Sequence, residues 1–175
     1  MALVVLLKGI NVGGHRSFRP GVLAKQLQRL DVSNIGAAGT FIVRKPVSRA
    51  ALHASISERL PFDAHVMIVS GRDILRLTSC DPFAGQRSRP DIIPFVSVLA
   101  KRRKRGPTLP LSIPAAGRWC VKVLAADGRF IIGLHRREMK AISCLGQLET
   151  IFGAAATTRS WSTFLTIARL LEAPA

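Results

Sequence analysis

The stretch that decides the fold is LVVLLKGINVGG, residues 3–14, in which five apolar residues lead through one lysine into a glycine-rich loop. A short apolar run bounded by glycine is typical of a strand buried on both faces. The loop needs glycine either because its backbone adopts positive φ or because another group approaches closely. A strand, a Gly/Asn loop and a following helix can present backbone N–H groups to an anion, although the sequence matches neither G-x-G-x-x-G nor G-x-x-x-x-G-K-[ST]. The alternative is a tight turn that packs a helix onto a sheet.

The rest of the first half predicts helices alternating with strands. A helix is expected to begin at Pro20, because proline fits the first helical position and three leucines then share one face, Leu23, Leu27 and Leu30. Ser48 and Ser70 are N-cap candidates for two further helices. Strands are expected within residues 35–43 and 64–69. The resulting order, β-α-β-β-α-β followed by a short helix, is that of the ferredoxin-like or split βαβ arrangement.

The second half predicts a strand, a hairpin and two helices. Residues 92–100 are an apolar run expected to form a strand with an edge or a bulge at Pro94. Asp127-Gly128 lies between two β-type runs, which is a strong hairpin signal. Apolar residues recur at helical spacing over residues 139–151, and an apolar stripe follows near the C-terminus.

A boundary between two subdomains is expected at residues 81–91, where proline, glycine and serine cluster. We therefore expect an α+β protein of two ferredoxin-like (split βαβ) subdomains packed together. The N-terminal ferredoxin-like subdomain would span residues 1–84 and the C-terminal α+β subdomain residues 85–175.

Two motifs resemble those of a known family. KGINVGG, residues 8–14, resembles the opening R-G-I-N-V-G-G, and TTRSWST, residues 157–163, resembles T-T-R-N-W-N-T. Both marks belong to a family of small bacterial proteins, domain-of-unknown-function family sixteen-ninety-seven. The resemblance implies the same ferredoxin-like arrangement, and it implies no activity because the family has none established.

The chain departs from the family pattern at positions that could bear on a site. Lys8 replaces the usual arginine, Ala38 and Thr40 stand where the family has S-G-N around Gly39, and Ser160 and Ser162 replace asparagines. If the replaced groups form a site, this chain has a weakened or altered one. If they are turn chemistry, serine and threonine serve equally well.

Positive charge is the clearest compositional signal, with 26 Lys+Arg against 10 Asp+Glu and a formal net charge of +16. Such a surplus favours a nucleic acid, a nucleotide or another polyanion as partner. Two basic groups are candidate nucleic-acid contacts: Lys101, Arg102, Arg103, Lys104 and Arg105, together with Arg136 and Arg137. The alternative is a solvated loop on a soluble basic protein. The chain lacks tyrosine, so a stacking platform for single strands has little support.

A second candidate site is the glycine loop, where a phosphate or carboxylate would meet a strand-end cation and loop amides. Its residues are Lys8, Asn11, Gly13 and Gly14, and they are joined by Arg159 if the two family-like motifs converge in space. Arg159 could equally well bind helix carbonyls or a carboxylate in a structural role. An enzyme acting on a small anionic substrate at this loop is the second functional hypothesis, and a non-catalytic oligomeric interaction module is the third.

Other chemistry has little support in the sequence. The three cysteines are widely spaced without C-x-x-C, which favours free thiols in a reducing compartment over a disulfide framework or a zinc site. The four histidines show no metal-ligand spacing, and the acidic residues are scattered. We therefore expect no metal and no cofactor. The absence of an apolar run long enough to span a membrane or to act as a signal peptide predicts a cytoplasmic protein that does not associate with membranes.

Overall fold

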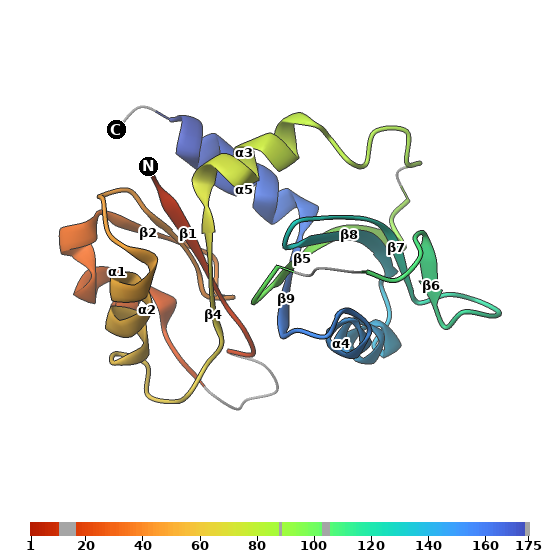
Figure 1. The fold of residues 1–175 in the computed structure, drawn as a ribbon, viewed down its shortest axis with the longest axis horizontal. Helices are drawn as coiled ribbons and strands as arrows, with labels where there is room; N and C mark the ends of the chain where they lie inside the picture. The colour runs from red at the N-terminus through yellow and green to blue at the C-terminus, as the bar shows by residue number, and fades with distance from the viewer. Residues whose placement is uncertain (11–16, 88, 103–105, 174–175) are drawn as a thin grey trace. The chain divides into compact units, whose positions relative to one another are not determined.

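The structure is a computed structural model that describes residues 1–10, 17–87, 89–102 and 106–173. These residues form two antiparallel sheets and five α-helices, which confirms the α+β class (Figure 1). The chain divides into two compact units. The first comprises residues 1–80 and 165–175, and the second comprises residues 81–164.

The first unit contains a four-stranded sheet with strand order β2-β3-β1-β4. Because β3 lies between β1 and β2, and β1 lies between β3 and β4, each β-α-β connection spans one intervening strand. The elements are β1 (Leu3–Leu7), α1 (Pro20–Gln26), a 3-10 turn (Gln28–Leu30), β2 (Val32–Ile35), β3 (Thr40–Val43), α2 (Arg49–Ser57), β4 (Val66–Ser70) and α3 (Gly71–Ser79).

Local sequence signals account for the helix starts of this unit. Pro20 occupies the first turn of α1. Ser48 Oγ accepts a hydrogen bond from Ala51 N at 3.1 Å, and Ser70 Oγ accepts one from Arg72 N at 3.2 Å. The three predicted helix starts are therefore confirmed. Helices α1 and α2 cover one face of the sheet, where leucines and isoleucine pack against strand residues in one core, including Leu23, Leu27, Leu52, Ile56, Val5, Phe41 and Ile68.

The second unit contains a five-stranded sheet with strand order β6-β7-β8-β5-β9. Helix α4 covers one of its faces, because Cys144, Leu148 and Phe152 belong to the same buried core as Phe95 and Ile131 (Figure 1). The elements are β5 (Ile92–Leu99), β6 (Leu111–Ile113), β7 (Val121–Asp127), β8 (Phe130–Arg136), α4 (Lys140–Phe152), β9 (Ala156–Ser160) and the start of α5 (Trp161–Glu172).

The Asp127-Gly128 hairpin is confirmed, and Gly128 adopts the positive φ of 60° that such a turn requires. Of the edge or bulge expected at Pro94, the structure shows no bulge, since Pro94 stays in register opposite Leu134, and it shows the edge, since Pro94 has no partner on β9. The pairing of β5 with β9 begins only at Phe95. Pro94, which has no N–H to donate, therefore removes no hydrogen bond between β5 and β9. A register shift occurs instead in β7, between Val123 and Ala125.

Strands β6 and β9 were not expected from the sequence. β6 has only three residues and lies in a proline-rich segment, whereas β9 reads ATTRS and lacks an apolar alternation. The second unit therefore runs β5-β6-β7-β8-α4-β9, with a single helix between its strands. The arrangement of two ferredoxin-like subdomains is not confirmed.

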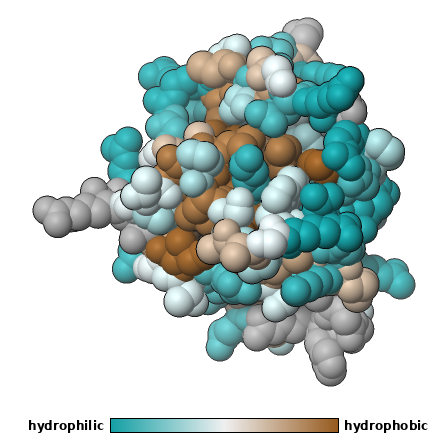
Figure 2. Space-filling model, turned by 90° about the vertical axis from the view of Figure 1, so that its right-hand side faces the viewer, coloured by the Kyte–Doolittle hydropathy of each residue, from teal (hydrophilic) through white to brown (hydrophobic). Residues whose placement is uncertain are grey.

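Local apolar areas interrupt the otherwise hydrophilic surface. On the face displayed in Figure 2, hydrophobic residues gather in the middle and hydrophilic residues surround them. Among the described residues, four large apolar side chains are highly exposed: Met1, Val22, Met139 and Ile142.

Candidate functional site

The glycine loop is described only at its start. Lys8 follows β1 and is half-buried, and its backbone N–H donates to His65 O at 3.0 Å. Asn11, Gly13 and Gly14 lie outside the described residues. An anion site at this loop therefore stays a prediction.

Arg159, the C-terminal member of that predicted site, lies on β9 and is only 9% exposed. Its Nη1 donates to Thr157 Oγ1 at 2.8 Å and to Thr158 O at 2.9 Å. Burial lowers the pKa of the guanidinium to about 10, so the group stays charged at neutral pH. The internal acceptors favour the structural role for this arginine. Lys8 belongs to the first unit and Arg159 to the second, and their convergence stays a prediction.

The two basic groups lie at opposite ends of the antiparallel pair β5–β8. Lys101 and Arg102 follow the end of β5 and are exposed, whereas Arg136 ends β8 opposite Ile92. The pairing runs from Ile92↔Arg136 to Val98↔Phe130, a span of six residues or roughly 20 Å. The described members of the two groups, Lys101 and Arg102 on one side and Arg136 and Arg137 on the other, therefore do not form one continuous cluster. Arg103, Lys104 and Arg105 lie outside the described residues.

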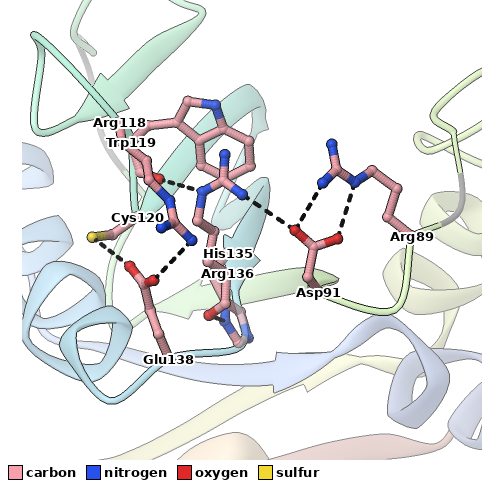
Figure 3. Close-up of polar contacts among 8 residues, drawn as sticks. All are labelled: Arg89, Asp91, Arg118, Trp119, Cys120, His135, Arg136 and Glu138. Atoms are coloured by element: carbon pink, nitrogen blue, oxygen red, sulfur yellow. Dashed lines mark hydrogen bonds and ion pairs between the residues drawn. The ribbon is translucent and has the colours of Figure 1, made fainter.

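Arg136 is the centre of a polar network at its end of the sheet (Figure 3). Its Nε donates to Trp119 O at 2.8 Å, and its Nη1 lies 3.3 Å from Asp91 Oδ2. The guanidinium also lies 4.4 Å from the centroid of the Trp119 ring, within cation–π range. With its side chain only 15% exposed, Arg136 holds three segments of the chain together.

Asp91 receives a second arginine in the same network. Arg89 Nε and Nη2 each donate to one of its carboxylate oxygens at 3.0 Å, which is a bidentate pair (Figure 3). These hydrogen bonds from Arg89, with the nearby charge of Arg136, hold the pKa of Asp91 below its ordinary value of 3.8. The Arg137 backbone N–H donates to Asp91 O at 2.9 Å, which fixes the strand ends on each other.

Glu138 forms the other half of the network. Cys120 Sγ donates to Glu138 Oε1 at 3.0 Å, and Arg118 Nη2 lies 3.4 Å from Oε2 (Figure 3). The hydrogen bond to Glu138, burial and the neighbouring Cys144 raise the pKa of Cys120 to about 11. The thiol is therefore protonated at neutral pH, which excludes it as a thiolate nucleophile.

A family model, described as protein of unknown function (DUF1697), matches residues 1–112. The chain belongs to the DUF1697 family. The match includes Arg89 and Asp91 and ends before Trp119, Arg136 and Glu138. The motif at residues 157–163 lies beyond the match, so its family character stays an expectation.

The DUF1697 chain also resembles a solved structure, described as the structure of conserved bacterial protein SP0830 from Streptococcus pneumoniae. The two are 18% identical, the alignment covers 98% of each chain, and the TM-score is 0.64. At this identity the likeness shows the fold alone. No curated protein matches the chain.

The described part of this DUF1697 chain contains no group of three His, Cys, Asp or Glu side chains that could hold a metal ion. None of its described helices has the length and apolar character needed to cross a membrane. The sequence named Arg136 only as a candidate nucleic-acid contact, and it did not single out Asp91, Trp119, Cys120 or Glu138 as site residues. The Arg89-x-Asp91 spacing was the one local signal available, because the other partners meet only through strand pairing.

Proposed function

We propose that this DUF1697 protein binds a phosphate-bearing polyanion, a nucleic acid, through the end of the second unit where β5 stops. The observation that carries the proposal is the exposed pair Lys101 and Arg102, which opens a run of five consecutive cations. Consecutive cations suit a chain of phosphates because each contact releases condensed counterions.

The charge balance of the second unit supports this choice. Residues 81–164 contain fourteen Lys and Arg against five Asp and Glu, so most of these cations cannot be paired one to one with an acid. Two of the five acids, Asp91 and Glu138, pair with arginines of the network at the opposite end of the sheet. At the β5 end, Lys101 and Arg102 are both exposed to solvent.

The hairpin turn gives this end a defined shape. A Cβ built on Gly128 would lie 3.7 Å from Arg102 Nη2, so the Arg102 guanidinium lies over the Asp127-Gly128 turn. The Leu99 N–H donates to Arg129 O at 2.8 Å, and Arg129 Nε donates to Leu99 O at 2.6 Å. Lys101 and Arg102 thus project from an anchored strand end. The lack of tyrosine favours backbone contacts over stacking on bases.

The test measures fluorescence anisotropy of a labelled duplex DNA and of a labelled RNA with the full chain at two salt concentrations. Contact with about six phosphates predicts a loss of affinity of about a thousand-fold between roughly 50 and 200 mM salt. The double variant Lys101→Ala, Arg102→Ala should lower the slope of log K against log salt by about two.

A matched control removes the same charge elsewhere. Lys25→Ala with Arg29→Ala changes two exposed cations of the first unit and should leave the slope within about half a unit of the wild type. The proposal fails if neither nucleic acid binds at the lower salt, or if the control loses as much slope as the double variant does.

A further inference from the structure

A cavity of about 390 Å³ opens beside the network, at the point where β8 gives way to α4. It is lined by Ile93, by residues 135–139 and by three residues of the first two turns of α4, Ala141, Ile142 and Leu145. All of these residues belong to the second unit. The volume lies within the range of about 300–1,000 Å³ that is usual for small-molecule sites.

The lining is mainly apolar, and part of it is left exposed. Met139 is 83% exposed and Ile142 is 63% exposed, and the two lie three residues apart on one helical face. They account for two of the four highly exposed large apolar side chains among the described residues. Covering them with an apolar group would remove this surface from water, which is favourable in proportion to its area.

The polar rim of the cavity is positive. Glu138 is hydrogen-bonded to Cys120 and paired with Arg118, and Asp91 is held by Arg89 and Arg136, so both carboxylates nearby already have cationic partners. Arg137 lines the cavity and is exposed, and the first turn of α4 contains no acidic residue. The rim therefore complements an anionic group.

We propose that this cavity binds a small amphipathic anion, namely an apolar chain or ring bearing one carboxylate. The apolar part would cover Met139 and Ile142, and the carboxylate would meet Arg137. A protein partner is disfavoured because two exposed apolar side chains fall far short of the roughly 800 Å² that each side of a stable interface buries. This site is independent of the polyanion proposal, since Lys101 and Arg102 lie at the opposite end of the sheet.

Equilibrium dialysis of the full chain against decanoate, with decanol as the neutral analogue, tests the proposal. We expect saturable decanoate binding at a single site and several-fold weaker binding of decanol. Ile142→Glu should weaken decanoate binding about tenfold, because it places a charge of the same sign in the mouth and removes apolar contact. Since Ile142 is exposed in the first turn of α4, where an acidic side chain is favourable, the variant should fold, which circular dichroism checks.

Two further variants keep the test decisive. Arg137→Ala should weaken decanoate several-fold and leave decanol unchanged, whereas Val22→Glu, at an exposed apolar position of the first unit, should change neither. Lys101→Ala with Arg102→Ala should also leave decanoate binding unchanged, which separates this site from the polyanion site. Absence of saturable binding, equal affinity for decanol, or undiminished binding by both Ile142→Glu and Arg137→Ala would overturn the proposal.

Discussion

The two ends of the five-stranded sheet use their arginines differently. Where β8 ends, Arg136 is 15% exposed and bonds to Trp119 O and Asp91, so its charge is used inside the protein. Where β5 ends, Lys101 and Arg102 project into solvent beside a hairpin turn. In sequence the two groups look alike, as short runs of cations. The difference shows that availability of a cation to a partner depends on the acceptors that the fold brings to it.

The largest loss of stability is expected from a substitution in β8, the strand that runs between the two ends. A Cβ at Gly133 would lie 2.5 Å from Lys122 O and 2.7 Å from Phe95 Cζ, and backbone on one side cannot move aside cheaply. We expect Gly133→Ala to lower the free energy of unfolding by about 3 kcal/mol, measured by urea denaturation. Gly146→Ala is the control, because Gly146 lies at an exposed position of α4 where a Cβ would have no neighbour within 4 Å, and this variant should be more stable by about 0.5–1 kcal/mol. Equal effects of the two would refute the packing argument.

Truncating one arginine at each end of the sheet tests directly whether the two ends use their arginines differently. Arg136→Ala should destabilise the protein by about 2 kcal/mol, because a half-buried carbonyl and a carboxylate lose a charged donor. Arg102→Ala should stay within about 0.5 kcal/mol of the wild type, as exposed substitutions usually do. Chemical denaturation measures the free energy of unfolding of both variants. A comparable loss of stability in the two would contradict the assignment of different roles to Arg136 and Arg102.

Asp91 should make the stability of the polar network around Arg136 depend on pH. Its folded-state pKa is lowered, chiefly by hydrogen bonds from Arg89, so its contribution is present above the ordinary carboxyl pKa and is lost as pH falls through the folded value. Asp91→Asn should therefore be less stable than the wild type at neutral pH, by less than Arg136→Ala, and the gap should close in acid. Melting temperatures across this pH range measure the gap, and Asp63→Asn, at an exposed position, controls for the lost charge. If the difference in melting temperature between the wild type and Asp91→Asn did not change with pH, Asp91 would be excluded as the source of the acid sensitivity.

The three cysteines should differ in their reactivity towards thiol reagents, and this prediction involves no change in stability. Cys80 is exposed, whereas Cys120 and Cys144 are buried, and the raised pKa of Cys120 keeps its thiol protonated. A thiol reagent such as DTNB should therefore modify one cysteine rapidly in the native protein and all three in guanidinium chloride. If the Cys80→Ser variant were modified rapidly, a buried cysteine, Cys120 or Cys144, would have to be accessible to the reagent in the native protein, which would contradict this expectation.

Local signals predicted much of the fold, and long-range pairing accounts for what they missed. Pro20, Ser48 and Asp127-Gly128 predicted element boundaries because helix caps and tight turns depend on neighbouring residues alone. Strands β6 and β9 were missed because their stability comes from β7 and β5, which lie elsewhere in the chain. The same holds at the candidate site, since Arg136 meets Trp119 and Asp91 through strand pairing and not through sequence spacing.

The shortness of β6 has a consequence for how the protein behaves at high concentration. β6 is an outer strand of only three residues, and Pro110 and Pro114 flank it and lack the N–H groups that a neighbouring chain would need. A second molecule has almost no backbone ladder to extend on this side, so the sheet resists edge-to-edge aggregation there without a charged side chain in the strand itself.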